Sequence, residues 1–249
     1  MSGVGESSPR SGGDGLWSPR LGRPPVIERD AVVAAAIAVG FDSLTVTGVA
    51  KRMGVRPSAL YRHFPGRTEL AAAAVEQVVA GAAWPGVPGQ PGRQWREHLG
   101  EVVWTAWNLY DRHPGLAVEV AALVFAPPTL AAVSQRIVEV LRGAGFEARD
   151  AVLIADMAGE LALGPFLLAR DPDAARTSEA DLGNGDGPVG VLDRIAARRR
   201  RLMRASSGKP GDHEVAQVLA AVVADDPRRW LQAKLELFLD AAATRRPAL

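Results

Sequence analysis

The sequence predicts an all-α protein with a small N-terminal helix-turn-helix unit and a larger C-terminal helical unit. Apolar residues recur at three- and four-residue spacing in nearly every long segment, and none shows the strict alternation of a half-buried strand. A pattern between residues 44 and 70 reads as two short helices joined at a glycine, as in a helix-turn-helix. With 249 residues the chain is long enough for a second unit with its own core.

Composition excludes several classes of protein. The absence of cysteine rules out disulfides, thiolate zinc sites and thiol catalysis, and fits a cytoplasmic location. The Gly/Ser/Pro-rich N-terminus has no apolar core that would direct export. The longest apolar run, 151–169, is interrupted by Asp156 and Glu160, so it predicts a buried helix and no membrane span.

We expect three regions along the chain. Residues 1–25 form a disordered arm, which either reaches DNA with its arginines or is simply solvated. Residues 26–70 form the DNA-binding domain, and residues 71–249 form an effector-binding and dimerisation domain. Thr68 is expected to cap a connecting helix that runs to about residue 83. The other expected helices are 26–39, 95–112, 116–125, 130–141, 148–169, 191–203, 213–223 and 227–243.

The helix-turn-helix pattern has a local physical basis. Thr45 can cap the first helix by accepting a free backbone N–H, and Gly54 can end it in a left-handed conformation. Pro57 suits the first turn of the second helix, whose buried face is expected to hold Leu60, Tyr61 and Phe64. Between residues 41 and 70 there are five basic and two acidic residues, whereas the whole chain is only +1. This surplus favours binding to phosphates.

The same residues resemble a known family. The runs Leu-Tyr-Arg-His-Phe at 60–64 and Arg-Thr-Glu-Leu at 67–70 are similar to the signature of TetR/AcrR-type transcriptional repressors, and residues 44–46 and 49–55 match that family's second helix and turn. The resemblance implies a homodimer that binds double-stranded, palindromic operator DNA. Two departures, Arg56 in place of the usual Ser or Thr and the weakly hydrogen-bonding pair Pro57 and Ala59, mean that the operator sequence is not implied.

We expect two sets of DNA contacts. Matching family positions imply that phosphates are bound by Tyr61, His63 and Arg67, and the hydroxyls of Thr45 and Thr47 are expected to contact neighbouring phosphates. Bases are expected to be read from the first two turns of the recognition helix, by Arg56, Pro57, Ser58, Ala59 and Arg62. Arg62 is the most discriminating of these, because its guanidinium can bond both O6 and N7 of a guanine.

The C-terminal unit is expected to pair two chains, because operator DNA offers two half-sites. Helices 148–169 and 227–243 are the best candidates, and the resemblance also implies pairing through the last two long helices; alternatively, they form a monomer's core. The same unit is expected to bind a small, largely apolar effector. The candidate pocket residues are Trp104, Trp107, Asn108, Tyr110, Phe125, Asp156, Glu160 and Phe166.

Plainer interpretations of these residues remain open. The aromatic residues can be ordinary core, and the acidic pair on one helix face, 156 and 160, can select a cationic ligand, lie in solvent or pair across a dimer. The run Arg198–Arg201 predicts a solvated basic face or a contact with an acidic partner or nucleic acid.

An enzyme is not expected. The four histidines have no metal-binding spacing, and the sequence lacks a nucleophile elbow, a phosphate loop and a dinucleotide fingerprint, so no catalytic residue, metal or cofactor is assigned. The sequence therefore predicts a repressor that a small apolar effector releases from DNA. The alternatives are a ligand-independent or non-specific DNA-binding protein and, less favoured, a helical enzyme.

Overall fold

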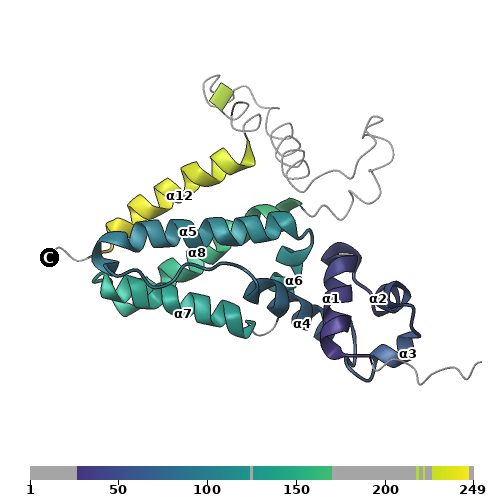
Figure 1. Cartoon of the computed structure of the whole chain (residues 1–249). Coiled ribbons are helices and arrows are strands. Elements are labelled where there is room, and N and C mark those ends of the chain that lie inside the picture. Colours follow the sequence, from purple (N-terminus) through teal and green to yellow (C-terminus); the bar gives the residue numbers. More distant parts are fainter. Residues whose placement is uncertain (1–26, 124–125, 170–216, 219–220, 222–225, 247–249) are drawn as a thin grey trace, which may run out of the picture.

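A computed structural model describes residues 27–123, 126–169, 217–218, 221 and 226–246. All regular elements within these residues are helical, which confirms the all-α prediction. Figure 1 shows a small lobe of short helices at one end of a longer bundle. In chain order the elements are α1 (Arg29–Val39), the 3-10 helix η1 (Phe41–Ser43), α2 (Val46–Met53), α3 (Pro57–Leu60), α4 (Arg67–Ala80), α5 (Pro91–Arg112), α6 (Leu116–Ala122), α7 (Pro128–Gly143), α8 (Ala148–Ala169) and α12 (Pro227–Ala243).

The small lobe, which we call the head, comprises residues 27–66. Its helices α1, α2 and α3 enclose a core that includes Val32, Val49, Leu60 and Phe64, each at most 1% exposed. The predicted start of α2 is confirmed, because Thr45 Oγ1 accepts a 2.9 Å hydrogen bond from the backbone N–H of Gly48. The predicted end is also confirmed: Gly54 ends α2 with φ +68°.

The larger lobe, which we call the body, comprises the described residues from Pro91 onward. Helices α5, α7 and α8 pack on one another, and α12 lies against α8. Trp95 of α5 packs edge-on against Phe146, with ring centroids 5.0 Å apart. Arg96 of α5 bonds Asp240 of α12 at 2.5 Å, so the last helix is also tied to α5. The body is therefore a helical bundle closed by α12 (Figure 1).

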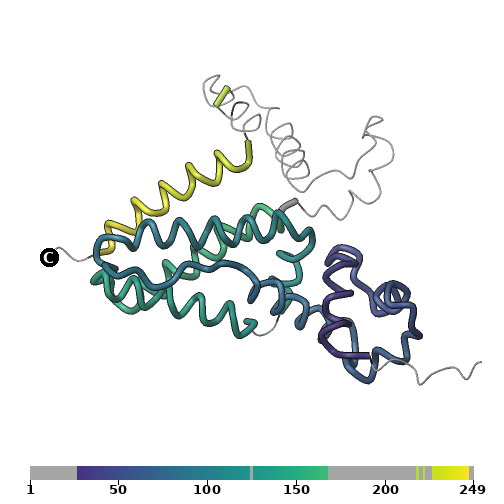
Figure 2. The backbone as a smooth tube through the Cα atoms, in the orientation of Figure 1, coloured from purple at the N-terminus to yellow at the C-terminus, as the bar shows by residue number. Residues whose placement is uncertain are grey.

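Helix α4 connects the two lobes. The backbone tube in Figure 2 leaves the head through α4 and continues as a long loop along α5. Residues Leu70, Ala74, Val75 and Val79 of α4 are fully buried. The connector packs against α1 on the head side and against α6 and α7 on the body side. Any movement of the head relative to the body must therefore repack α4.

Two local predictions are wrong. Thr68 does not cap α4: the helix already begins at Arg67 after an extended N-cap at Gly66, so Thr68 lies exposed in its first turn. Tyr61 does not belong to the buried face, since it is 54% exposed. Leu60 and Phe64 are four residues apart and share one side, whereas Tyr61 follows Leu60 by one residue and points about 100° away from it.

The remaining predicted helices either match the observed ones except at their ends or fall outside the described residues. The expected bounds of 148–169 and 227–243 are those of α8 and α12. The first helix starts three residues later than expected, at Arg29, and α5 starts four residues earlier, at Pro91. The segments 1–25, 171–190 and 191–203, the last with its arginine run 198–201, lie outside the described residues, as do Phe125 and most of 213–223.

Candidate nucleic-acid interface and its control elements

The residues predicted to read bases surround the start of α3. Arg56 is its N-cap and Pro57 its first residue; both are exposed, as are Ser58 and Arg62, whereas Ala59 is half-buried. The opposite side of this helix is closed, because Leu60 is 1% exposed. Among the described residues, no hydrogen bond or ion pair holds the Arg62 side chain. The helix therefore presents two free cationic side chains from a rigid base.

The predicted phosphate contacts lie on either side of this helix. Thr45 and Thr47 are exposed at the N-terminus of α2, where free backbone N–H groups attract anions. The Thr45 hydroxyl oxygen accepts the capping bond, and its own proton can still be donated to a phosphate. Tyr61 is exposed and His63 is half-buried in the turn after α3. Two of these four side chains therefore belong to the start of α2, and two directly follow α3.

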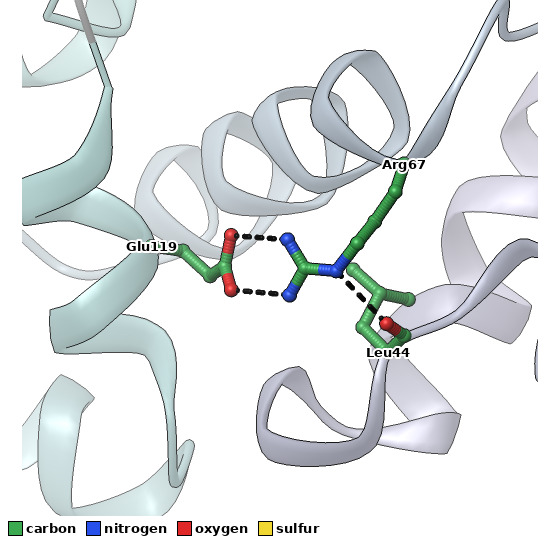
Figure 3. A network of polar contacts seen from close by, with 3 residues as sticks. All are labelled: Leu44, Arg67 and Glu119. Atoms are coloured by element: carbon green, nitrogen blue, oxygen red, sulfur yellow. Dashed lines mark hydrogen bonds and ion pairs between the residues drawn. The ribbon is translucent and has the colours of Figure 1, made fainter. Parts of the chain in front are cut away.

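Arg67 has partners of another kind (Figure 3). Its Nη1 and Nη2 atoms bond the two carboxylate oxygens of Glu119 on α6, at 3.1 and 2.6 Å. Its Nε atom donates to the backbone carbonyl of Leu44, at 3.0 Å. The Glu119 hydrogen bond is the main reason why the pKa of Arg67 is raised. Arg67, which is predicted to bind a DNA phosphate, is therefore bonded to a residue of the body in this structure.

A second head–body contact lies beside this pair. His113, at the end of α5, packs edge-on against Phe41 of η1 with ring centroids 6.5 Å apart. Burial is the main cause of the lowered pKa of His113, and the neighbouring Arg112 lowers it further. Gly115, with φ +86°, brings the α6 N-terminus onto the backbone of Asp42. Sequence reasoning did not find this contact, because its two sides are over 70 residues apart and neither has a recognisable motif.

The aromatic residues predicted for the effector pocket form one cluster between α5 and α8. The ring centroid of Trp107 lies 4.7 Å from that of Phe166 and 6.2 Å from that of Trp104. The ring centroids of Tyr110 and Phe166 are 5.6 Å apart. We call these four residues the ring cluster. Trp107 is fully buried, and its indole Nε1 has no hydrogen-bond partner. Burial raises the pKa of Tyr110 to about 12, so this phenol stays protonated.

The polar residues predicted for the same pocket lie elsewhere, which corrects that part of the prediction. Asp156 and Glu160 are exposed on α8, so they do not line the ring cluster. Asn108 is also exposed, and it borders a surface cavity of about 310 Å³ together with Asp111, Arg112 and Arg228. Helical periodicity explains why these two acidic residues are exposed. Residues 156 and 160 lie on one face of α8, whereas the buried Ala158, Ala162 and Phe166 lie on another.

Another cavity, of about 240 Å³, lies between the loop before α5 and α5 itself. It is lined in part by Glu97, His98 and Glu101. His98 is 3% exposed, and its Nε2 atom has no hydrogen-bond partner. Burial chiefly lowers the pKa of His98, and Arg136 also lowers it, whereas Glu101 and the backbone of Gly86 oppose this shift. Within the described residues, no group of three or more acidic or histidine side chains is placed to hold a metal ion.

The outer face of the bundle exposes apolar side chains. Val152, Leu153 and Met157 of α8 are 58%, 47% and 44% exposed, and Leu237 of α12 is 72% exposed. Large apolar side chains that gather on adjacent helices typically mark an interface. None of the helices in the described part of the chain combines the length and apolarity needed to cross a membrane.

Comparison with known proteins gives concordant results. Residues 30–74 match the family model of bacterial regulatory proteins, tetR family. The chain is 32% identical, over 109 residues, to the HTH-type transcriptional repressor DrrR1 of Streptomyces coeruleorubidus. That match covers 41% of this chain and only 40% of the relative.

Solved structures share the fold over most of the chain. A possible TetR family transcriptional regulator from Streptomyces coelicolor A3(2) is 25% identical, with a TM-score of 0.66 over 88% of this chain and all of that one. The TetR family protein ActR of Streptomyces coelicolor, in complex with actinorhodin, is 17% identical, with a TM-score of 0.65 over 88% of this chain and 97% of that one. The similarity therefore extends from the head through the body.

Proposed function

We propose that this chain is a member of the tetR family of bacterial regulatory proteins, a transcriptional repressor that binds operator DNA as a dimer and is released by a small effector. The observation that carries this proposal is the exposed surface around α3, where Arg56 precedes and Arg62 follows a short helix whose other side is closed by Leu60. A protein acting on a bacterial chromosome works in the cytoplasm.

We assign two roles to the exposed head residues. Thr45, Thr47, Tyr61 and His63 bind phosphates and set the position of α3, since hydroxyl and imidazole groups can donate hydrogen bonds to phosphate oxygens. Arg56, Pro57, Ser58, Ala59 and Arg62 face the bases. Phosphate contacts supply affinity for any duplex, whereas the bidentate hydrogen bonds that an arginine makes to guanine supply specificity.

The proposed dimer forms through α8 and α12. Together these helices expose four large apolar side chains, which lose contact with water when two chains pair. A twofold arrangement presents two α3 helices to two half-sites about 34–36 Å apart, which is the spacing that one turn of DNA imposes. The exposed carboxylates of Asp156 and Glu160 then lie at or beside the interface and favour one register of the pair.

We place the effector at the ring cluster. The cluster is packed, so an effector must displace or rotate rings to enter, and this supplies the coupling to the rest of the body. The unpartnered indole N–H of Trp107 favours a ligand with a hydrogen-bond acceptor on an otherwise apolar frame. ActR, which shares this fold, has been solved in complex with actinorhodin, and this supports a ligand for the present chain. Release from DNA follows if the ligand binds more tightly to a dimer whose two heads no longer match the half-site spacing than to the DNA-binding dimer.

Competition binding tests the DNA-binding part of this proposal. A labelled DNA fragment from beside the gene is titrated with the protein and then challenged with the unlabelled fragment or with unrelated duplex of equal length. We expect the unrelated duplex to compete at least about a thousandfold less well, as is usual for specific binding. Equal competition by both duplexes indicates a non-specific DNA-binding protein, and the absence of any complex contradicts the proposal.

A further inference from the structure

The contact between Arg67 and Glu119 joins the first residue of the connecting helix α4 to α6 of the body. Arg67 also contacts the backbone of Leu44, its second partner, which directly precedes the Thr45 cap of α2. The guanidinium therefore bridges the segment before α2 and the carboxylate on α6 (Figure 3). It belongs to the N-terminus of α4, where anions are favoured. Glu119 occupies a position at Arg67 that a phosphate group would also suit.

The two partners differ in burial. The Glu119 side chain is 12% exposed and that of Arg67 is 46% exposed. A buried carboxylate that loses its partner keeps its desolvation cost, so removing Arg67 from Glu119 is unfavourable. The arginine has a long, partly solvated side chain and can reach a new partner by rotation alone. If Arg67 exchanges Glu119 for a phosphate, only the arginine side chain has to move. The cost of the exchange is that the carboxylate of Glu119 is left without its partner.

We propose that Glu119 is a positioning residue that limits DNA affinity by competing with a DNA phosphate for Arg67. This inference rests on the proposed DNA-binding function. In the free protein Glu119 and Leu44 hold the guanidinium, and in the complex a phosphate replaces Glu119. A shift of α6 that presses Glu119 onto Arg67 lowers affinity for every duplex, and a shift that withdraws it raises affinity. The body thus acts on the phosphate contact directly, in addition to any change in head spacing.

The test measures dissociation constants at several salt concentrations with the full-length chain, using the labelled gene-proximal fragment and an unrelated duplex. Glu119→Gln keeps the shape of the side chain and removes its charge. We expect about a three- to tenfold gain in affinity for both duplexes, because a charge-assisted bond becomes available to phosphate. The slope of log affinity against log salt should equal that of wild type, because Arg67 contacts one phosphate in both complexes, whereas Arg67→Gln should flatten it by about one.

Two further variants identify the cause. In the double variant Glu119→Gln with Arg67→Gln, the gain should disappear, and the dissociation constant should equal that of Arg67→Gln alone. The matched control is Asp111→Asn, which breaks the ion pair between Asp111 and Arg228, with 2.7 Å between the atoms and side-chain exposures of 21% and 46%. This pair joins α5 to α12 within the body, so its loss should produce no gain in affinity for either duplex.

The wild-type protein supplies a measurement that does not depend on variants. The Arg67 side-chain Nε–H resonance, identified by its loss in Arg67→Gln, should shift when either duplex is added. A Glu119→Gln protein that binds more weakly than wild type, or equally well, overturns the inference, as does an Arg67 resonance unmoved by DNA. If wild type retains no duplex at all, the proposed function itself fails, so the two failures are distinguishable.

Discussion

Gly115 lies against the backbone of Asp42, where a Cβ atom on the glycine would be 2.6 Å from the backbone nitrogen and from the Oδ1 atom of Asp42. Only a residue without a side chain fits, and its φ of +86° also favours glycine. This contact brings the start of α6 to the head, and Glu119 lies one turn further along the same helix. The position of Glu119 relative to Arg67 therefore depends on the close approach of Gly115.

Gly115→Ala should be strongly destabilising. The left-handed backbone costs about 1–2 kcal/mol with a Cβ atom, and the overlap with Asp42 adds about 1–3 kcal/mol. Gly54→Ala is the matched control, because its φ of +68° is also left-handed but nothing lies within 4 Å of its added Cβ. Thermal unfolding should show the larger loss for Gly115→Ala. Equal losses would mean that the two lobes do not meet closely at Gly115.

Arg62→Ala should relax specificity. The exposed guanidinium at the end of α3 is free to form a bidentate contact with guanine, so its loss should cost about 1–3 kcal/mol at one base position in each half-site. Binding to a set of singly substituted operator fragments measures this. A loss of the same size on operator and unrelated DNA would instead make Arg62 a phosphate contact.

The charge variant Met157→Asp should separate the dimer. It places a carboxylate on the exposed apolar surface of α8, in the proposed interface, where the charge would be desolvated without a partner. Sedimentation should show a shift from dimer to monomer at micromolar concentration. Val87→Asp is the control, since Val87 is similarly exposed, at 51%, but lies in the loop before α5. A Met157→Asp protein that remains dimeric moves the interface elsewhere.

Trp107→Phe should weaken effector binding. The variant keeps a ring in the cluster but removes the unpartnered indole N–H, so a ligand with an acceptor loses a hydrogen bond of about 0.5–1.5 kcal/mol. Planar aromatic ketones are suitable probes, measured by tryptophan fluorescence and by release of DNA. Trp84→Phe is the control, because its Nε1 already donates to the Val79 carbonyl at 2.8 Å. Equal affinity of both variants would place the ligand elsewhere.

Stability should decrease as the pH falls from about 7.5 to about 5.5. Burial lowers the pKa values of His98 and His113 below the ordinary value near 6.5, so in this range the unfolded chain binds protons that the folded chain does not. Carboxylates titrate mainly at lower pH. The thermal unfolding midpoint of wild type should fall with pH across this range, and in His98→Leu the midpoint should change less with pH. An unchanged dependence in this variant would show that His98 is protonated without penalty when folded.

Most of the helices could be predicted because their causes are local. The Thr45 cap, the Gly54 stop and the apolar periodicity of α8 depend on residues within a few turns. The polar half of the pocket was misplaced, because the face of α8 that turns inward depends on packing against α5. The Arg67–Glu119 contact joins residues 52 positions apart and leaves no pattern in either segment.

Hydroxyl-radical footprinting on the gene-proximal fragment tests the central claim, that a dimer reads two half-sites with its α3 helices. We expect two protected patches whose centres lie about one helical turn, roughly 10–10.5 base pairs, or a multiple of it apart, related by an approximate palindrome. Arg62→Ala should weaken both patches together. Even protection along the whole fragment, or a single patch without a symmetric counterpart, would contradict the claim.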